Sequence, residues 1–410
     1  MAVAALGLLG AGCGSAIPED QRTLVGTIGE VDAPTGAWAD DLAFLASELG
    51  ERHVDPFHNI SAADFQAEVD GSISRSADWT QTVGYYEVAR LVGLVGDSHT
   101  IVIPPANVER YPIVVQPLDD GLMVDATARA DRDLLSGELL AIDGIPVADL
   151  ITLASEYVSA DTDAGRARQA IQHITSPAFI ELTRLARPEP GTITVRRSDG
   201  ETIEREVFAS ETADLELLPN DARPRLLIER QPDAFYWTQD IADSNTIYMN
   251  YRRAQEADDL PMAELAEFLT DAADREGFDR LIIDLRQNTG GNSLVLQPLV
   301  DALAGHALGD DVYVLIGPRT FSSAILNAIT LRDVLGATLV GQPTLAPQSH
   351  YGEVQTFTLP DSNLVVSYST MFFDRGSDQP LAPDVEVEIT MDDLRSGIDP
   401  ALDAALSHGR

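Results

Sequence analysis

Two stretches decide the fold: Leu281–Leu296, LIIDLRQNTGGNSLVL, and the segment at 317–328, GPRTFSSAILNA. The first begins with an apolar run and the second follows one, VYVLI, and such runs are typical of buried strands. Because the carboxyl ends of parallel strands meet at one edge of a sheet, we expect the two following loops to lie side by side. One loop offers backbone N–H groups at a double glycine, and the other offers hydroxyls at a helix start. This layout is the one that acyl transfer with an oxyanion hole requires.

The composition limits the class of protein. A chain of 410 residues with 44% hydrophobic residues predicts two or three domains with real cores. Asp and Glu number 66 against 27 for Lys and Arg, so the net charge is −39. This charge argues against nucleic acid and anionic membrane surfaces as partners, because both would repel it. It suits a chain that stays soluble in salt or outside the cell, and equally a generally acidic proteome.

The N-terminus contains the only cysteine, Cys13, so no intramolecular disulfide can form. Residues 1–12, MAVAALGLLGAG, are apolar and small, and with Cys13 they resemble the end of a bacterial lipoprotein signal. The resemblance implies export to the periplasm or cell surface, with a lipid anchor at Cys13 as the one membrane attachment. Gly10 and the lack of a preceding basic residue depart from the pattern, so a chance small-residue N-terminus is the alternative. The run is too short to span a bilayer.

Changes of pattern along the chain predict four parts. They are a signal-like segment and tether at 1–35, a helical domain at 36–103, a β-rich module at 104–210 and an α/β domain at 211–410. The β-rich module has a helical insertion at 151–187 and a hairpin turn at Asp199-Gly200. Its segment Gly137–Leu150 resembles PDZ-type domains, which bind extended chain ends by strand addition. A β-rich spacer without ligand is the alternative.

The C-terminal part alternates between strand and helix patterns. Strands are expected at TIYMNY, RLIIDLR, VYVLIG and TLVG, with helices at 259–275, 294–305 and 322–335. This alternation predicts βαβ units and a mostly parallel sheet. The tail at 352–391 returns to strand-like patterns.

The residues of the two deciding loops have ordinary interpretations beside the chemical one. Ser322 and Ser323 follow a strand and begin a helix, where a serine most often caps the helix and can also present its Oγ as a nucleophile. Gly290 and Gly291 can form a tight turn or bring bare backbone close to a ligand. Each signal is weak by itself.

Together the motifs resemble the S41 peptidases, the family of C-terminal processing and tricorn-type proteases. The stretch DLRQNTGG looks like that family's strand and loop, and TFSSAILNA followed by GQPT at 341–344 looks like its nucleophile helix and next turn. GDSHT at 96–100 resembles the Ser-His segment of the tricorn branch. With LPDSN, APDVEV and the PDZ-like segment, the resemblance spans about residues 85–390.

The resemblance implies a catalytic apparatus. A gapless match makes Ser322 the nucleophile, and a one-residue gap would make it Ser323. The oxyanion hole would consist of N–H groups of Gly290, Gly291 and the residue after the nucleophile, Ser323.

The base separates the two branches of the family. The place of the catalytic lysine holds Pro347, and the helix position of the family's Glu holds Ile325, so a Ser-Lys site is not expected. In the tricorn branch a histidine is the base, and His99 fits that place, with Ser98 as a residue that orients it. A histidine suits the role because it is mostly neutral at pH 7.

The remaining site residues are less defined. The family's acid would fall at Ser377, and Asp378 is the next residue and our assignment, with Asp374 and Asp97 as alternatives. His350, three residues beyond Pro347, is the alternative base.

The sequence therefore predicts a ClpP/crotonase-like α/β catalytic core with an N-terminal helical domain and a PDZ-like β-rich module. The resemblance implies an exported serine peptidase that cleaves polypeptides through an acyl-enzyme, with the substrate's C-terminus as a possible point of recognition. No cofactor and no metal site is expected, because the histidines are scattered and no HExxH motif or cysteine pair occurs. The alternative is a non-catalytic protein of the same fold that binds a peptide or hydrophobic ligand.

Overall fold

The computed structural model describes residues 37–105, 108–182, 190–211 and 216–409. Cys13, the signal-like segment and the tether lie outside the described residues. The described chain forms two compact units. The first contains the chain up to Arg223 together with Tyr351–Phe373, and the second contains Pro224–His350 and the chain from Asp374 onward. The predicted domain boundaries at 36–103, 104–210 and 211–410 remain predictions.

Three amphipathic helices begin the first unit: α2 (Ala37–Arg52), α3 (Ala62–Arg75) and α4 (Gln81–Gly93). Leu42, Leu45 and Leu49 recur at helical spacing in α2, and all three are buried. The Ser61 side chain accepts a hydrogen bond from the Asp64 N–H at 3.1 Å, so it caps α3.

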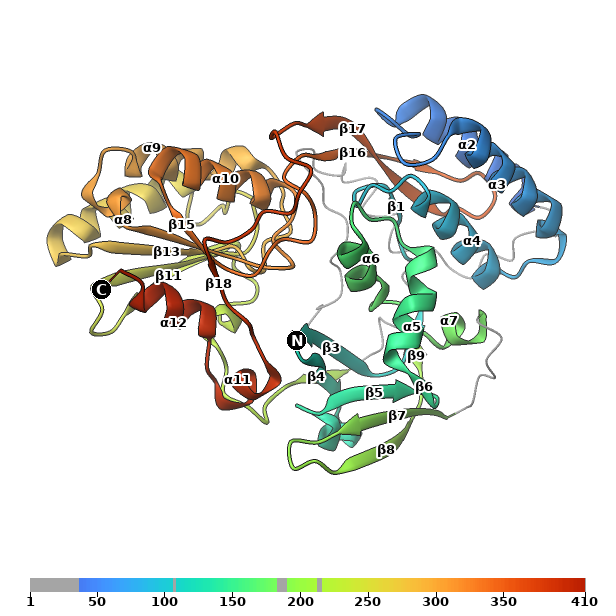
Figure 1. Ribbon diagram of the computed structural model, residues 1–410, viewed down its shortest axis with the longest axis horizontal. Coiled ribbons are helices and arrows are strands. Elements are labelled where there is room, and N and C mark those ends of the chain that lie inside the picture. Colours follow the sequence, from blue (N-terminus) through green and yellow to red (C-terminus); the bar gives the residue numbers. More distant parts are fainter. Residues whose placement is uncertain (1–36, 106–107, 183–189, 212–215, 410) are drawn as a thin grey trace. The chain divides into compact units, whose positions relative to one another are not determined.

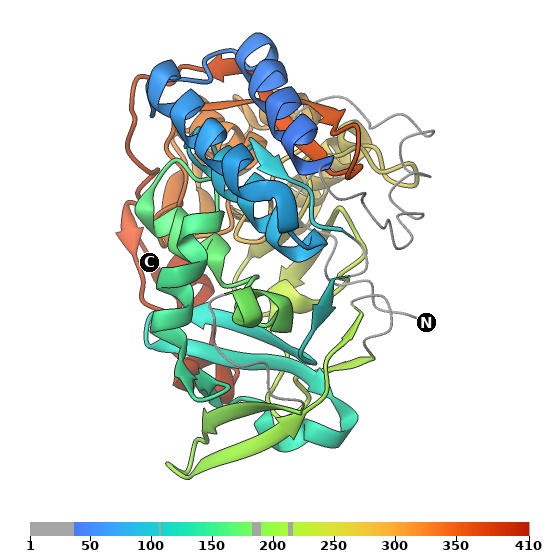
Figure 2. The ribbon, with the colours of Figure 1, turned by 90° about the vertical axis from the view of Figure 1, so that its right-hand side faces the viewer.

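Two strands from far along the sequence belong to this helical region. Strands β16 (His350–Thr358) and β17 (Val365–Phe373) form a three-stranded sheet with β1 (Ile101–Val102), in the order β1-β17-β16. Asp41 of α2 accepts the N–H groups of Asp361 and Ser362, both at 2.9 Å, in the turn between β16 and β17. Figure 1 and Figure 2 both place these strands beside the N-terminal helices.

The rest of the first unit is an antiparallel sheet in the order β10-β4-β5-β7-β8, with β3 paired to β4 and β6 paired to β5. The bounds of these strands are β3 Ile113–Leu118, β4 Gly121–Ala128, β5 Glu138–Ile142, β6 Ile145–Pro146, β7 Gly191–Arg196, β8 Thr202–Val207 and β10 Leu217–Pro219. A small pair consists of β2 (Glu109–Arg110) and β9 (Ser210–Glu211). The likeness to PDZ domains remains a prediction.

The expected long helical insertion at 151–187 is broken in the described residues. It contains the end of α5 (Val147–Ala154), then α6 (Asp163–Ala170) and α7 (Pro177–Leu182). The Thr162 side chain accepts the N–H of Gly165 at 3.0 Å and starts α6 anew, while Pro177 starts α7. These local signals limit each helix to two turns.

The second unit contains a six-stranded sheet in the order β11-β12-β13-β14-β15-β18. Strand β11 is antiparallel to β12, and every other neighbouring pair is parallel, as the sequence predicts. The strand bounds are β11 Tyr236–Ile241, β12 Thr246–Tyr251, β13 Arg280–Asp284, β14 Val312–Ile316, β15 Thr338–Gly341 and β18 Val385–Glu386.

Helices cover both faces of this sheet (Figure 1). On one face lie α8 (Met262–Glu276), α9 (Gln297–Leu303) and α10 (Ser323–Leu335). On the other face lies α12 (Pro400–Ser407), preceded by α11 (Met391–Ser396). Strands buried on both faces read as continuous apolar runs, which is why LIID and VYVLI are visible in the sequence.

Candidate active site

The Gly290-Gly291 loop follows β13 and lies against the start of α10. The backbone φ of Gly290 is +107° and that of Gly291 is +131°, values that L side chains rarely adopt. A Cβ at Gly290 would lie 2.8 Å from Ser322 Cβ and 3.2 Å from Ser322 Oγ. A Cβ at Gly291 would lie 2.3 Å from the carbonyl oxygen of Ala254. Both glycines are therefore required by backbone conformation and by close approach.

Ser322 has a strained backbone. It lies between β14 and α10 with φ 53° and ψ −126°, a region that non-glycine residues avoid at a cost of about 1–3 kcal/mol. Its side chain makes no capping hydrogen bond, so the ordinary interpretation of this serine as a helix cap is wrong. Nucleophiles at strand-to-helix turns use the same kind of strained position to expose their Oγ.

Ser323 is held differently. Its Oγ donates a 2.6 Å hydrogen bond to the carbonyl of Gly291, so this hydroxyl joins the helix start to the glycine loop. Its N–H is the first of α10, in the turn where helix N–H groups lack intrahelical acceptors. The two serines thus have distinct environments: one is strained and the other fastens the loop.

Asn288 connects the two loops. Its Nδ2 donates to the carbonyl of Tyr251 at 2.8 Å, and its own carbonyl accepts the N–H of Phe321 at 3.1 Å. Its Oδ1 accepts the N–H of Gly290 at 2.9 Å. The Gly290 N–H, which we expected in an oxyanion hole, is therefore engaged with Asn288 in this structure.

A buried ion network fixes the base of the glycine loop. Arg286 pairs with Asp284 at 2.6 Å and with Asp399, at the start of α12, at 2.7 Å. The Tyr248 hydroxyl donates to Asp284 at 2.8 Å. Burial opposes the charge of Arg286, but the two carboxylates outweigh it and raise the pKa of Arg286 well above its usual value. Asp399 is a partner that the sequence did not indicate.

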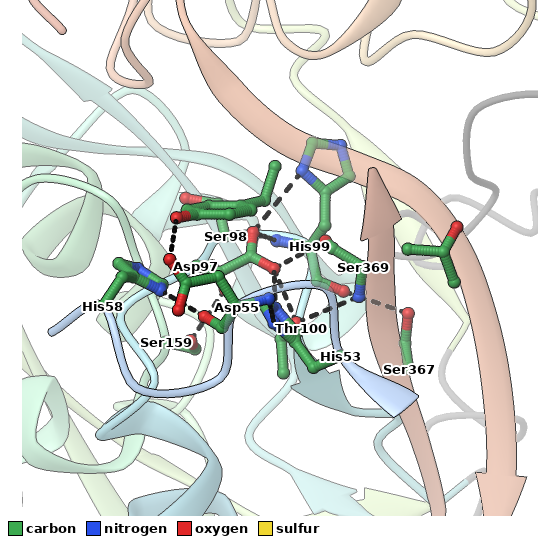
Figure 3. Close-up of polar contacts among 12 residues, drawn as sticks. His53, Asp55, His58, Asp97, Ser98, His99, Thr100, Ser159, Ser367 and Ser369 are labelled. Atoms are coloured by element: carbon green, nitrogen blue, oxygen red, sulfur yellow. Dashed lines mark hydrogen bonds and ion pairs between the residues drawn. The ribbon is translucent and has the colours of Figure 1, made fainter. Parts of the chain in front are cut away.

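In the first unit, the segment GDSHT folds around the buried carboxylate of Asp97, shown in Figure 3. Asp97 Oδ2 accepts the Thr100 and Ser369 hydroxyls, both at 2.6 Å, and lies 3.1 Å from His53 Nε2. Burial alone would raise the pKa of Asp97, but the His53 hydrogen bond, the charge of His99 and the two hydroxyls hold it well below its usual range. Asp97 is therefore a buried anion.

His99 is oriented from its own segment. Its N–H donates to Asp97 Oδ1 at 2.9 Å, and its ring Nδ1 lies 3.8 Å from the same oxygen. Its carbonyl accepts the Ser367 hydroxyl of β17 at 3.0 Å. The side chain is buried, so the ring is held in place beside a carboxylate.

Asp97 also fixes the tautomer of His53. The Nδ1 of His53 accepts the N–H of Asp55 at 3.0 Å, so its proton is on Nε2, which faces Asp97. His53 therefore supports the Asp97 carboxylate.

Ser98 contacts Asp161 through its backbone and its hydroxyl. Its Oγ accepts the N–H of Asp161 at 3.1 Å, and its N–H lies 3.3 Å from Asp161 Oδ2. Burial, together with the negative charge of Asp97, raises the pKa of Asp161 to about 6. Asp161 was not singled out from the sequence, because nothing in its local pattern indicates that it lies beside GDSHT.

The other sequence candidates lie in the second unit. Asp378 is exposed in the segment after β17, and Asp374 Oδ1 accepts the N–H of Gly376 at 2.8 Å. His350 is buried, and its Nδ1 donates to the carbonyl of Gln348 at 3.1 Å, which leaves Nε2 as the acceptor nitrogen. Ile325, at the place of the family's Glu, is fully buried in the core under α10. The printed sequence has no lysine, so a Ser-Lys dyad cannot form within it.

No protein-family model and no curated protein matches this sequence at a significant level. Solved structures do match. CPAF complexed with lactacystin covers 90% of this chain and 97% of its own, with TM-score 0.67 and 17% identity. Mature CPAF alone covers 91% and 98%, with TM-score 0.64 and 16% identity. The expected mixed α/β fold is confirmed, and this chain shares it with CPAF. The photosystem II D1 C-terminal processing protease also matches, at TM-score 0.43 and 11% identity over 89% of this chain and 98% of its own.

At 17% identity this similarity establishes the fold and not the chemistry of individual residues. Within the described residues, no group of three or more His, Cys, Asp and Glu side chains is arranged to hold a metal ion. None of the described helices is both long and apolar enough to cross a bilayer.

Proposed function

We propose that this protein is a serine-type peptidase in which Ser322 is the nucleophile. The observation that carries the proposal is the backbone of Ser322, at φ 53° and ψ −126°, with no cap bond from its hydroxyl. A fold pays for such strain where it places a reactive group. Ser323 is the weaker candidate because its hydroxyl already donates to Gly291.

The oxyanion hole in this proposal consists of the N–H groups of Gly291 and Ser323. Gly291 is next to Gly290, whose Cα approaches Ser322 closely, and Ser323 follows the nucleophile directly. The partial positive charge at the N-terminus of α10 favours a developing oxyanion at this place. Gly290 contributes its lack of a side chain, since its N–H donates to Asn288.

We propose His99 as the general base and Asp97 as the residue that orients it. Ser322 belongs to the second unit and His99 to the first. The support is the motif resemblance and the position of the His99 ring, whose Nδ1 lies 3.8 Å from the buried Asp97 carboxylate. Asp97 thus replaces Asp378 as our choice of acid, because Asp378 is exposed. His350 remains the alternative base.

The reaction follows from these roles. Ser322 Oγ attacks the peptide carbonyl carbon while His99 accepts the hydroxyl proton. The oxyanion that forms accepts hydrogen bonds from the N–H groups of Gly291 and Ser323. Collapse of the tetrahedral intermediate breaks the C–N bond, and the protonated imidazole gives its proton to the leaving amine. Water, deprotonated by the same imidazole, then attacks the acyl-enzyme and releases the new carboxylate with Ser322 restored.

The remaining parts of the proposal rest on the sequence. We propose a polypeptide substrate, a PDZ-like module within 104–210 that takes part in recognising it, and export with a lipid anchor at Cys13. Radiolabelled palmitate incorporation in a bacterial host, compared between wild type and Cys13→Ser, tests the anchor. Equal incorporation in both proteins would exclude it.

Peptide cleavage tests the central part. Wild-type protein is incubated with a peptide library, and new termini are read by mass spectrometry. Ser322→Ala should abolish cleavage while circular dichroism stays unchanged, and Ser323→Ala should retain cleavage at a reduced rate. Cleavage by Ser322→Ala that Ser323→Ala lacks would reverse the assignment of the nucleophile.

Two observations favour a second candidate, a non-catalytic binding protein of the same fold. Ile325 places a core side chain where the Ser-Lys branch has a glutamate, and Pro347 stands in the place of the lysine. Against this, a site that has lost its chemistry has no need to keep the strain at Ser322. If no peptide is cleaved and no serine reacts with a fluorophosphonate, the binding protein is the better description.

A further inference from the structure

Three arginines lie at the edge of the second unit's sheet where Ser322 lies. Arg252 and Arg253 follow the carboxyl end of β12, and Arg319 follows that of β14. Neighbouring β12, β13 and β14 are parallel, so their carboxyl ends share one edge. Together these three residues form what we call the arginine cluster.

The chain path brings the arginine cluster close to the candidate nucleophile. Ala254, the residue after Arg253, pairs with Gly291 through a bridge in which the Ala254 N–H donates to Gly290 at 3.0 Å. Gly290 in turn lies so close to Ser322 that a Cβ added to it would be 2.8 Å from Ser322 Cβ. Arg319 precedes Ser322 by three residues, so the two Cα atoms lie at most about 11 Å apart.

The arginine cluster has no acidic partner of its own among the described residues. No carboxylate lies within ion-pair distance of Arg252, Arg253 or Arg319 in the part of the chain that the structure describes, although the sequence supplies 66 acidic residues for 27 arginines. Arg253 lies over the ring of Phe235 at 5.6 Å. Arg252 donates to the carbonyl of Ile228 at 2.8 Å, while its buried Nε has no hydrogen-bond partner there.

The charges around Arg252 leave it incompletely balanced. Burial, and then the positive charge of Arg319, lower the pKa of Arg252. Tyr248 and Asp284 act in the opposite direction and raise the pKa of Arg252. Both are already engaged, because the Tyr248 hydroxyl donates to Asp284 at 2.8 Å and Asp284 pairs with Arg286 at 2.6 Å. A partly buried guanidinium with an unused N–H and a neighbouring cation is an environment that an anion stabilises.

We propose that the arginine cluster binds a carboxylate of the substrate next to the scissile bond. This inference rests on the proposed function and names the chemical class of its substrate: peptides with an acidic group near the point of cleavage. Guanidinium groups match carboxylates in a bidentate geometry, which gives direction as well as charge. The group comes either from an Asp or Glu side chain or from the C-terminal α-carboxylate. In a chain of net charge −39, a local positive site also offsets the general repulsion of such peptides.

The experiment uses the full chain and four peptides that share one cleavable sequence. The first pair tests a side-chain carboxylate: one peptide has Glu beside the scissile bond, the other has Gln there, and both end in an amide. The second pair tests the C-terminal carboxylate: both peptides have Gln beside the scissile bond and end close to it, one in a free acid and the other in an amide. We compare kcat/KM for wild type, for the double variant Arg252→Gln with Arg319→Gln, and for the control Arg332→Gln. Arg332 lies near the C-terminal end of α10 and pairs with Asp333 at 3.4 Å.

We expect the wild type to prefer one of the carboxylate peptides over its neutral partner by about 10-fold to 100-fold. The preferred pair identifies the source of the carboxylate. The double variant should lose the preference yet still cleave the neutral peptide, and Arg332→Gln should keep the preference. Added salt should weaken the preference in the wild type. The inference would be overturned if the wild type had equal kcat/KM for the carboxylate peptide and its neutral partner in both pairs, or if the double variant kept the preference.

A binding measurement separates failure of this inference from failure of the proposed function. Fluorescence anisotropy with the Ser322→Ala protein compares the affinity of the labelled acid and amide peptides without any turnover. The cluster is supported if the acid peptide binds more tightly than the amide and this difference is lost when Arg252 and Arg319 are replaced. This holds even if the wild type cleaves no peptide. Equal binding refutes the cluster even if the wild type is an active peptidase.

Discussion

Replacing Gly290 by alanine should damage both folding and catalysis, because the position satisfies two requirements at once. At φ +107° an L side chain is strained, and a Cβ there would lie 2.8 Å from Ser322 Cβ and 3.2 Å from the carbonyl oxygen of Phe321. Contacts of this length force the neighbours to move. Backbone strain and overpacking together should cost about 2–4 kcal/mol of unfolding free energy.

The catalytic effect follows from the same contact. The new methyl group must displace Ser322, and a shift of about 1 Å in a reacting group costs on the order of 10²-fold in rate. We expect kcat/KM for a peptide substrate to fall by about that factor in Gly290→Ala.

A matched control separates strain from contact. Gly336 ends the same α10 at φ +67°, and a Cβ there meets no atom within 4 Å. Gly336→Ala should therefore cost only the strain of a left-handed residue, about 1–2 kcal/mol, and leave kcat/KM unchanged. The measurements are urea unfolding and initial rates. If the two variants are equally stable and equally active, Gly290 does not shape the site.

Three further predictions concern buried titratable side chains of the first unit. Asp97→Asn replaces an oxygen that faces three donors by an amide or turns it away, so unfolding free energy should fall by about 1–3 kcal/mol and peptide cleavage by at least tenfold; unchanged rates would exclude Asp97 as the orienting acid. The pKa of Asp161 is raised to about 6, so the folded unit keeps a proton that the unfolded chain loses near pH 4, and stability falls as pH rises through this window. Asp161→Asn should remove that fall, about 3 kcal/mol between pH 4 and 7 in urea titrations; an unaltered slope contradicts the raised pKa. Burial, and then the charge of Arg110, lower the pKa of His173 to about 3, so its contribution is complete above pH 6.5 and is lost as pH falls toward 3. His173→Gln should reduce acid sensitivity between pH 6.5 and 4, a trend opposite in sign to that of Asp161 and measurable by the same titrations; identical acid unfolding of both proteins would refute it.

The parallel sheet was predictable because its strands are buried on both faces. Runs such as TIYMNY and VYVLI coincide with β12 and β14, and the expected helix at 322–335 matches α10 from Ser323 to Leu335. The close backbone approach at Gly290 and Gly291 was likewise predictable, since only glycine fits these two positions. In these places a local pattern and the final structure are governed by the same short-range physics.

Other features depend on contacts between distant parts of the chain. The pairing of Ser98 with Asp161 and the binding of Ser369 to Asp97 join segments 63 and 272 residues apart. The Asp41 bonds to the turn between β16 and β17 span more than 300 residues. No periodicity or motif in one segment contains information about such partners. The strain at Ser322 was also invisible, because the sequence around it reads as an ordinary helix cap.

The most direct test of the account measures how fast Ser322 reacts with a fluorophosphonate. Labelling rates are compared for wild type, His99→Ala and His350→Ala, and the modified residue is located by mass spectrometry. The account predicts an adduct on Ser322 that forms about 10²-fold to 10⁴-fold more slowly without His99 and at the normal rate without His350. An adduct on Ser323, no adduct in the wild type, or an unchanged rate in His99→Ala would contradict it.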